Sequence, residues 1–193
     1  MFSVHILGIL ESINKNNIKL KEVDLRGKNL GYEVGAAIAG ALERNTTLTT
    51  LDLEGNRLEN IGSKAFASML IKNTTIITLK LGSNYIGYDD EGRAFADMLN
   101  RNTTLTKLDL KGNRLGEVGG AAVAGALERN TTLTALNLNW NFLKEGFGIA
   151  ILAALEKNNT LTELDIGANP LGEDFGLSIA ELLERNTTLT TLY

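Results

Sequence analysis

One stretch of the chain, residues 102–115, constrains the fold more than any other feature. It reads NTTLTKLDLKGNRL, and from Leu105 onward it follows the spacing L-x-x-L-x-L-x-x-N-x-L. Around Asp109 apolar and polar residues alternate, as they do in a half-buried strand. Asn113 then stands where the backbone must turn, and its short amide suits main-chain groups that a turn leaves unpaired. The stretch therefore predicts a short strand followed by a tight turn.

The same phrase recurs along the whole chain in steps of 28, 28, 29, 28, 28 and 28 residues, counted from the first leucine position of each copy: Leu20, Leu48, Ile76, Leu105, Leu133, Leu161 and Leu189. The turn position holds an asparagine in five copies: Asn56, Asn84, Asn113, Asn141 and Asn169. In the first copy it is Lys28, with Asn29 one place late, so we expect that turn to be built differently. A tandem repeat of this kind buries the apolar face of each unit against its neighbours.

The period and the spacing resemble the leucine-rich repeats, and units of about 28 residues resemble the ribonuclease-inhibitor-like subfamily. The repeats of tropomodulin, the Ran GTPase-activating proteins and the NOD-like receptors are similar. The resemblance covers essentially all 193 residues. It implies an α/β leucine-rich-repeat solenoid, a right-handed superhelix or horseshoe arc, with parallel strands on the concave face and helices on the convex face.

The resemblance also implies one domain over residues 1–193. An N-terminal capping segment covers residues 1–19, with a helix over residues 2–15 that contains the single histidine, His5. Repeats start near residues 20, 48, 76, 105, 133 and 161, and a truncated repeat covers residues 189–193. Because the sequence stops inside a strand, we expect either a fragment of a longer protein or an end covered by another chain, which includes end-to-end self-association.

Between the strands, apolar residues line up in columns at helical spacing. One column holds Ile38, Phe66, Phe95, Val123, Ile151 and Ile179, and another, four residues on, holds Leu42, Leu70, Leu99, Leu127, Leu155 and Leu183. Each helix is followed by an asparagine: Asn45, Asn73, Asn102, Asn130, Asn158 and Asn186. We expect these asparagines to close the helices in the left-handed conformation. Each is also part of an N-x-T sequon, which offers N-glycosylation as the alternative interpretation.

Composition narrows the classes of partner and compartment. The formal net charge is −4 and the pI is near 5.1, which argues against nucleic acid or an anionic membrane as a partner. The chain has no cysteine, and its apolar start has neither a basic region nor a cleavage site, so we predict a cytoplasmic protein without a signal peptide. No apolar run approaches the roughly 20 residues that span a bilayer.

Residues for catalysis, cofactors or metals are missing from the repeat pattern. With no cysteine and one histidine, neither nucleophilic constellations nor zinc sites can be assembled, so we predict no enzyme, no cofactor and no small-molecule substrate. The acidic run at residues 89–91, where the one 29-residue step occurs, is a candidate calcium loop. It lacks the alternation of such a loop, and we interpret it as a solvated turn after the strand.

Positions that vary between repeats carry the information about a partner. The residue between the two strand leucines is acidic in most copies, which predicts a concave face suited to a protein partner carrying Lys or Arg. The candidate partner-binding residues come from this row, from the next outward row and from the loop edge: Asp52, Glu54, Arg57, Lys80, Tyr85, Asp109, Lys111, Arg114, Asn137, Asn139, Trp140, Phe142 and Asp165.

The fifth repeat departs most from the pattern. Trp140 stands where other copies carry Gly, Ser or Ala, and Phe142 follows the turn asparagine. Two aromatic residues at a loop edge are typical anchors of an interface. The alternative is that Trp140 folds back over Phe147 or a neighbouring loop as a filler.

These features together predict a non-enzymatic protein–protein interaction module that binds through its concave face and the adjacent loop edge. Alternatives are a dedicated protein inhibitor of an enzyme, an effector of intracellular bacteria delivered into a host cell, and the repeat segment of a larger receptor or actin-regulating protein. A consensus-engineered scaffold is a further alternative, but irregularities such as Lys28 argue against it.

Overall fold

The computed structural model describes residues 4–193, apart from the side chains of residues 4, 5, 88 and 89. The helices are α1 (Val4–Asn14), α2 (Gly31–Leu42), α3 (Glu59–Lys72), α4 (Tyr88–Arg101), α5 (Gly116–Leu127), α6 (Glu145–Leu155) and α7 (Phe175–Leu183). The strands are β1 (Glu22–Asp24), β2 (Thr50–Asp52), β3 (Thr78–Lys80), β4 (Lys107–Asp109), β5 (Ala135–Asn137), β6 (Glu163–Asp165) and β7 (Thr191–Leu192).

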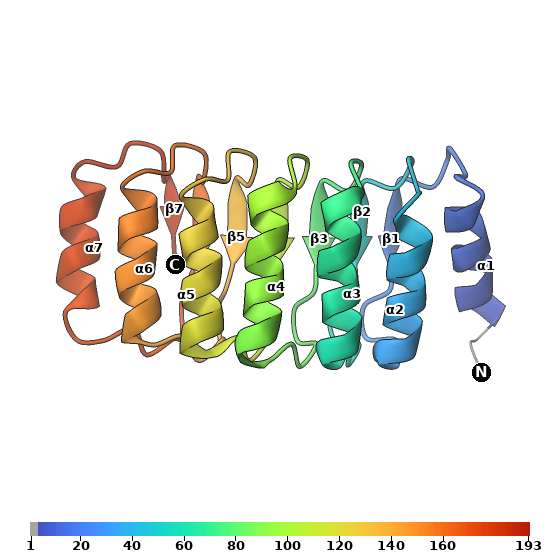
Figure 1. Ribbon diagram of the computed structural model, residues 1–193, viewed down its shortest axis with the longest axis horizontal. Helices are drawn as coiled ribbons and strands as arrows, with labels where there is room; N and C mark the ends of the chain where they lie inside the picture. Colours follow the sequence, from blue (N-terminus) through green and yellow to red (C-terminus); the bar gives the residue numbers. More distant parts are fainter. Residues whose placement is uncertain (1–3) are drawn as a thin grey trace.

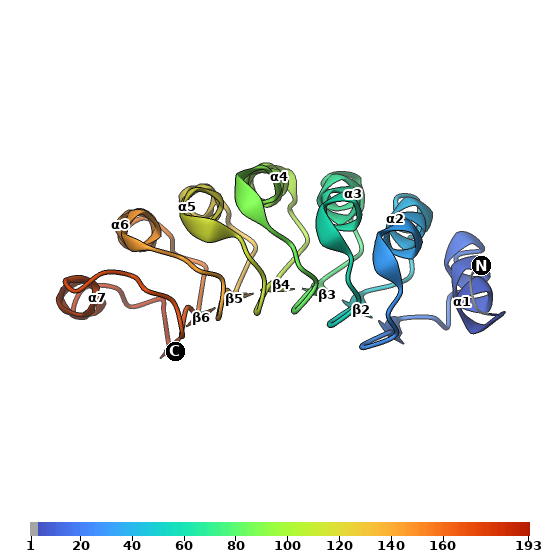
Figure 2. The same cartoon turned by 90° about the horizontal axis from the view of Figure 1, so that it is seen from below.

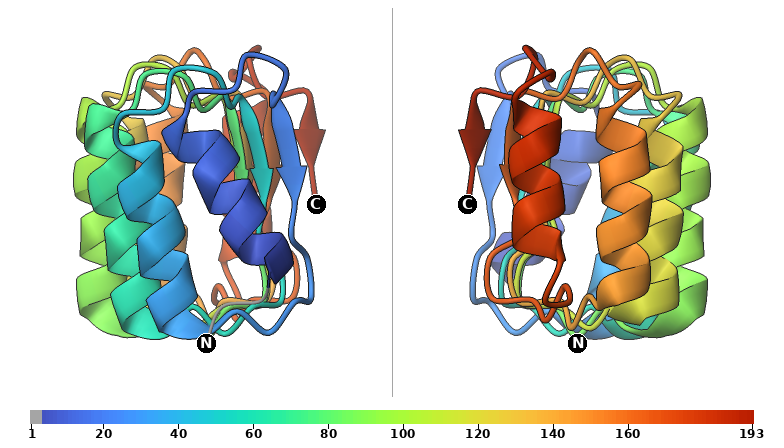
Figure 3. Two further views of the ribbon diagram at one scale, coloured as in Figure 1. Left: turned by 90° about the vertical axis from the view of Figure 1, so that its right-hand side faces the viewer. Right: turned by 90° about the vertical axis from the view of Figure 1, so that its left-hand side faces the viewer.

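Within the described residues the strands form one seven-stranded parallel sheet in the order β1-β2-β3-β4-β5-β6-β7. Each residue pairs with its counterpart in the next repeat, so that Leu79 of β3 lies opposite Leu108 of β4. The helices form a second layer on one side of the sheet (Figures 1 and 3). Seen along the helices, the two layers curve into an arc with the strands inside and the helices outside (Figure 2). The predicted α/β leucine-rich-repeat arc is confirmed.

The core lies between the two layers and is built from the predicted columns. The strand leucines and the helix column from Ile38 to Ile151 are buried, because the period of 28 residues returns them to the same face of every unit. The prediction for the second column is wrong at its last residue: Leu183 is 38% exposed, and Leu182 is buried in its place. In α7 the residues that face the core are Phe175, Ile179 and Leu182. Gly176 faces open space, because no described atom lies within 4 Å of the place where its Cβ would be.

At the N-terminal end, α1 begins the arc and buries Ile6 and Ile13 against the core. The sequence predicted a helix over residues 2–15, and its described part, Val4–Asn14, agrees. Residues 1–3 and the side chain of His5 lie outside the described residues.

The asparagines that follow the helices do not adopt the predicted left-handed conformation. Asn73 is extended, with φ −76° and ψ 130°, and Asn102 is nearly the same. The Asn102 Nδ2 donates to the carbonyl of Leu70 in the preceding unit at 2.7 Å, while its Oδ1 accepts the N–H of Leu105 at 2.7 Å. These side chains therefore tie each helix end to the previous unit, and their burial and bonding favour this structural role over glycosylation.

The extra residue of the third repeat lies at the edge where helices begin, as predicted. The neighbouring Gly87 forms an isolated parallel bridge with Arg114. The acidic run, however, does not form a solvated turn in a loop: it belongs to the first turn of α4. Glu91 is buried and bonded to Lys64 Nζ at 3.1 Å, and Asp90 lies 3.8 Å from the same nitrogen. The side chain of Asp89 lies outside the described residues.

Candidate functional site

Buried asparagines hold the edge of the arc at which the strands end and the helices begin, called here the strand-end edge. Asn113 Nδ2 donates to the carbonyls of Leu110 at 2.8 Å and Leu81 at 3.1 Å. Its Oδ1 accepts the N–H groups of Asn84 and Ile86, both at 3.0 Å. The amide thus pairs main-chain groups of two adjacent units, and the other turn asparagines repeat most of this pattern: Asn56, Asn84, Asn141 and Asn169.

The first turn is not built differently, contrary to the expectation from Lys28. The N–H groups of Lys28 and Leu30 donate to Asn56 Oδ1 at 3.0 and 3.3 Å. Asn29 has φ +51°, close to the +57° of its counterpart Arg57. The asparagine of the next unit supplies the acceptor, so the first unit needs none of its own.

The residue before the turn position has a left-handed backbone in each of the first six repeats. Its φ is +64° at Gly27, +70° at Gly55, +54° at Ser83, +63° at Gly112, +55° at Trp140 and +53° at Ala168. This conformation costs a residue with a side chain about 1–2 kcal/mol. Tyr85 and Phe142, which follow their asparagines, are left-handed as well, each with φ +58°. Large aromatic residues therefore occupy positions that suit glycine or asparagine.

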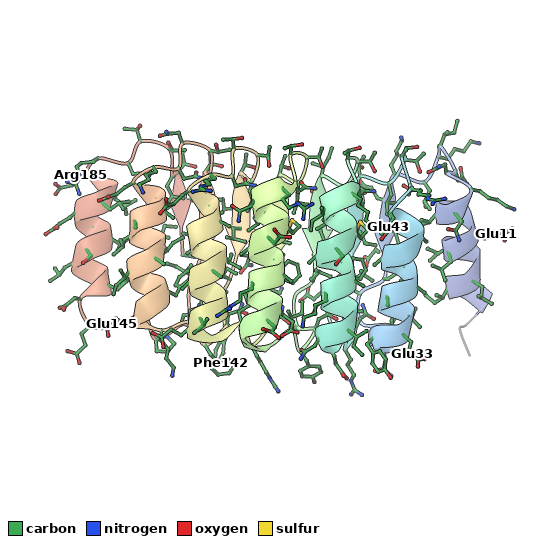
Figure 4. All side chains as sticks on the ribbon, viewed as in Figure 1. Glu11, Glu33, Glu43, Phe142, Glu145 and Arg185 are labelled. Atoms are coloured by element: carbon green, nitrogen blue, oxygen red, sulfur yellow. The ribbon has the colours of Figure 1, made fainter. Side chains whose placement is uncertain are left out.

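We call the side chains at this edge the edge ridge: Arg57, Tyr85, Arg114, Trp140 and Phe142. Trp140 is 65% exposed, Phe142 60% and Tyr85 48%. Figure 4 shows Phe142 at the edge where the helices begin, opposite Arg185 at the far edge. Because a filler would be buried, the interpretation that Trp140 packs over Phe147 or a neighbouring loop is wrong.

Within the edge ridge, Arg114 lies over the ring of Tyr85, with its Cζ 5.3 Å from the ring centroid, which is cation–π distance. The two residues border an open hollow of about 600 Å³ that is completed by Glu59, Asn60 and Ile61. Among the described side chains, the arginines that form ion pairs are Arg26, Arg101 and Arg185, so Arg57 and Arg114 keep unpaired guanidinium groups.

On the concave face, the first four strands neutralise most of their charge internally. The carboxylate of Asp52 lies 3.2 Å from Lys80 Nζ and 3.5 Å from Arg26 Nε, and the residue is only 6% exposed. Lys111 Nζ lies 2.9 Å from the carboxylate of Glu54. The sequence predicted that Asp52 is free to bind a partner. Because it is buried between two cations, little of its surface is accessible to one.

Farther along the concave face, strands β3 to β6 and Tyr193 line a depression of about 230 Å³. Its lining includes Asn137 and the charged residues Lys80, Lys107, Asp109, Glu163 and Asp165. Asn139 Nδ2 donates to Asp165 at 3.1 Å, and neither Asp109 nor Asp165 forms an ion pair among the described side chains. Burial raises the pKa of the Asp109 carboxyl above its ordinary value, opposed by the backbone N–H of Lys111 at 2.9 Å. Lys80 and Lys107 also line the depression, and the charges of Lys111 and Lys80 act on Asp109, so the depression carries charges of both signs.

The comparison with protein families decides the class of the chain. The model of the TMOD/LMOD leucine-rich domain matches residues 93–192, which is more than half of the chain, and a leucine-rich-repeat model matches residues 44–67. The chain belongs to the TMOD/LMOD leucine-rich domain family. This confirms the predicted leucine-rich repeat and its similarity to tropomodulin, in a fold family without catalytic activity.

Solved structures share the fold of this TMOD/LMOD-type domain. One is described as leiomodin-1 actin-binding site 2; it is 23% identical over 96% of this chain and 91% of its own, with a TM-score of 0.63. The tropomodulin C-terminal domain of Caenorhabditis elegans is 15% identical, with coverages of 94% and 92% and a TM-score of 0.60. A TLR13–ssRNA13 complex is 21% identical over 85% of this chain but only 21% of its own, with a TM-score of 0.54. No curated protein matches the chain.

Two further observations concern membrane spans and metal ligands. No helix among residues 4–193 has the length and apolar character needed to cross a membrane. The described side chains also contain no group of three His, Cys, Asp or Glu residues placed to hold a metal ion.

Sequence reasoning found the members of the edge ridge but missed two neighbours and one property. Ile61 on α3 and Val118 on α5 are exposed beside it. Both occupy the same position of alternate repeats, and this recurrence was visible in the aligned repeats. The left-handed backbone under Trp140 was also signalled, by the glycines that hold its position in three other copies.

Proposed function

We propose that this chain is a non-enzymatic protein-binding module that contacts its partner through the edge ridge and the concave depression. The observation that carries the proposal is Trp140, which combines a left-handed backbone with 65% exposure. The left-handed backbone lowers the stability of the isolated domain and the exposed ring adds nothing to it, and strain of this kind collects at binding sites. Contact with a partner would bury the ring, and this burial would contribute to affinity.

The concave depression supports a partner with basic side chains. Asp109 and Asp165 lie on alternate strands with Asn137 between them, about 10 Å apart at the usual strand spacing. A Lys or Arg side chain entering the depression would meet two carboxylates that form no ion pair among the described side chains, with Lys80 and Lys107 at the rim of the same depression. Complementary charge of this kind mainly accelerates association.

The partner that we propose first is actin. The support is membership of the TMOD/LMOD domain family and the likeness in fold to a structure described as leiomodin-1 actin-binding site 2. The compartment that we propose is the cytoplasm, on the absence of cysteine from the chain.

The test is binding of the purified chain to monomeric and filamentous actin, by anisotropy and co-sedimentation. We expect saturable binding that Trp140→Ala weakens by about 2 kcal/mol, or about 30-fold. The matched control is Leu177→Ala, which removes an exposed apolar side chain from α7 on the convex side and should leave affinity unchanged.

The outcomes separate the parts of the proposal. Absence of binding to both forms of actin rejects actin, and a pull-down from lysate with Trp140→Ala as the negative control then tests protein binding itself. Equal binding by the wild type and both variants rejects the edge ridge as the contact surface. The edge ridge is also rejected if the wild type and Trp140→Ala capture the same proteins in equal amounts in the pull-down.

A further inference from the structure

The edge ridge has a period of two repeats. The position after the turn asparagine holds Arg57, Tyr85, Arg114 and Phe142 in four consecutive units, so that cationic and aromatic side chains alternate. The two arginine-bearing units also carry the exposed aliphatic residues Ile61 and Val118, both at the same position in the first turn of their helices. In the first and sixth units that position is acidic, with Glu33 and Asp174, and in the third unit, between the two arginine-bearing units, the same count gives Asp89.

Hydrogen bonds fix the spacing of this pattern. The N–H of Glu59 donates to the carbonyl of Asn84 at 3.0 Å, and the N–H of Gly116 donates to that of Asn141 at 3.1 Å. Between them the N–H of Arg114 donates to the carbonyl of Ile86 at 2.6 Å, next to the Gly87–Arg114 bridge. The loops therefore stand at the spacing of paired strands, about 4.8 Å, and the two-unit period is about 10 Å.

An α-helix laid across the units matches both distances. Its pitch is about 5.4 Å, so one turn falls on each unit, and seven residues advance it by about 10.5 Å. Residues i and i+7 then meet the two arginines, while residues near i+4 and i+11 meet the aromatic side chains. A strand returns to the same face about every 6.6 Å, which matches neither distance. A polyproline helix repeats about every 9.3 Å, three residues of about 3.1 Å, which matches the two-unit period but not the spacing of single units.

The unpaired arginines of the edge ridge favour a bound helix with acidic side chains. Arg57 and Arg114 form no ion pair among the described side chains, so carboxylates at i and i+7 would gain new partners. The α3 to α6 N-termini point their partial positive charge to the same edge. First-turn acids lie at the same edge: Glu59 borders the hollow beside Arg114. Asp90 and Glu91 are paired with Lys64, and Glu117 accepts the N–H of Gly146 at 3.0 Å.

We propose that the edge ridge binds an acidic amphipathic helix of a protein partner, laid across the second to fifth units with one helical turn per unit. Carboxylates at i and i+7 pair with Arg57 and Arg114. Apolar side chains one turn on pack against Tyr85 and against Phe142 and Trp140. The inference rests on the proposed function only in that both use the edge ridge, and its test contains neither actin nor lysate.

The probe is an end-capped helical peptide of about 16 residues, long enough for four turns, with Glu at i and i+7, Leu at i+4 and i+11, and no tryptophan. Trp140 is the only tryptophan of the chain, so its emission reports directly on the ridge. We expect a saturable blue shift on titration. The double variant Arg57→Ala/Arg114→Ala should weaken binding at least about tenfold. The matched control Arg44→Ala/Arg129→Ala removes two exposed arginines at the opposite edge and should leave it unchanged.

Two further peptides complete the design. One carries Lys at the two Glu positions and should bind at least about tenfold more weakly; the other carries a central proline that breaks the helix and should not saturate below about 1 mM. Equal binding of the proline peptide overturns the helix, and equal binding of the lysine peptide overturns the charge pairing. If no peptide changes the emission up to about 1 mM, the inference is overturned, while the actin test is unaffected.

Discussion

The two edges of the arc are held by the same kind of asparagine hydrogen bonds, but they differ in how much their exposed residues vary. At each edge an asparagine bonds main-chain groups of its own and the preceding unit. Asn113 does so at the strand-end edge, and Asn102 does so at the opposite edge, where helices end, called here the helix-end edge. The first unit, with Lys28, is the exception at the strand-end edge. At the helix-end edge the phrase around the asparagine is nearly invariant between repeats, whereas at the strand-end edge the next residue changes in each of the four central units. A backbone held by a buried amide does not depend on its exposed neighbours, and only the strand-end edge uses that freedom to vary them.

The largest expected effect tests whether the two asparagine sets are equivalent. Asn113→Ala and Asn102→Ala should each lower the free energy of unfolding by about 1–3 kcal/mol, because each leaves buried main-chain groups unpaired. Chemical denaturation measures both. Asn100→Ala, an exposed asparagine of α4, is the control and should change it by less than about 0.5 kcal/mol. An unchanged midpoint for Asn113→Ala would remove the structural role from the strand-end set.

The second prediction separates binding from stability at the variable edge. Trp140→Gly should reduce affinity for a bound partner by about 2 kcal/mol. It should not lower the unfolding midpoint, because glycine adopts φ +55° without strain and the lost ring was exposed. Thr103→Ala, at an exposed site of the helix-end edge, should change neither quantity. A midpoint that falls for Trp140→Gly with affinity intact would make the indole structural.

The third prediction compares the depression with the ion-paired part of the concave face. Asp109→Asn/Asp165→Asn should slow association several-fold at low salt, and raised salt should reproduce the effect in the wild type. Asp52→Asn is the comparison: its carboxylate is buried between Lys80 and Arg26 and it removes one charge rather than two, so it should slow association less than the double substitution. Stopped-flow association kinetics measure all three proteins. Equal slowing by Asp52→Asn would mean that the steering charge is not confined to the depression.

The smallest effect concerns the paired end of the same face. The Arg26 side chain donates to both carboxylate oxygens of Asp24 and holds the pKa of that carboxyl down at about 2. Arg26→Gln should raise the Asp24 pKa towards its ordinary value. A carbon-detected NMR titration follows it, with Asp165, which forms no ion pair among the described side chains, as the reference. A titration curve unmoved by the substitution would contradict the pairing.

The sequence predicted the arc, the strand register and most of the core, because these depend on what the repeats share. A leucine such as Leu108 must face the core in every unit, and its pairing with Leu79 follows from the period. The sequence did not predict the pairing of Asp52, since that depends on rotamers of residues about 28 positions away in each direction. It also misassigned Leu183, because the rotation of a terminal helix about its axis depends on what packs beside it.

At the candidate site the sequence identified the aromatic residues as exceptions but left their exposure undecided. The choice between filler and anchor for Trp140 depended on the backbone under it. A left-handed residue directs its side chain differently from a strand residue, and no pattern of apolar spacing records that angle.

The two-unit alternation along the edge ridge has a consequence for how such a protein evolves. Each turn asparagine bonds only within its own unit and the one before it, so a whole unit can be gained or lost without disturbing the bonds of distant ones. Gain or loss of one unit between Arg57 and Phe142, however, would place two like side chains next to each other and reverse the order of all that follow. Only an even number preserves the order. Within this segment the sequence is therefore expected to grow and shrink by pairs of repeats, while outside it any number is tolerated.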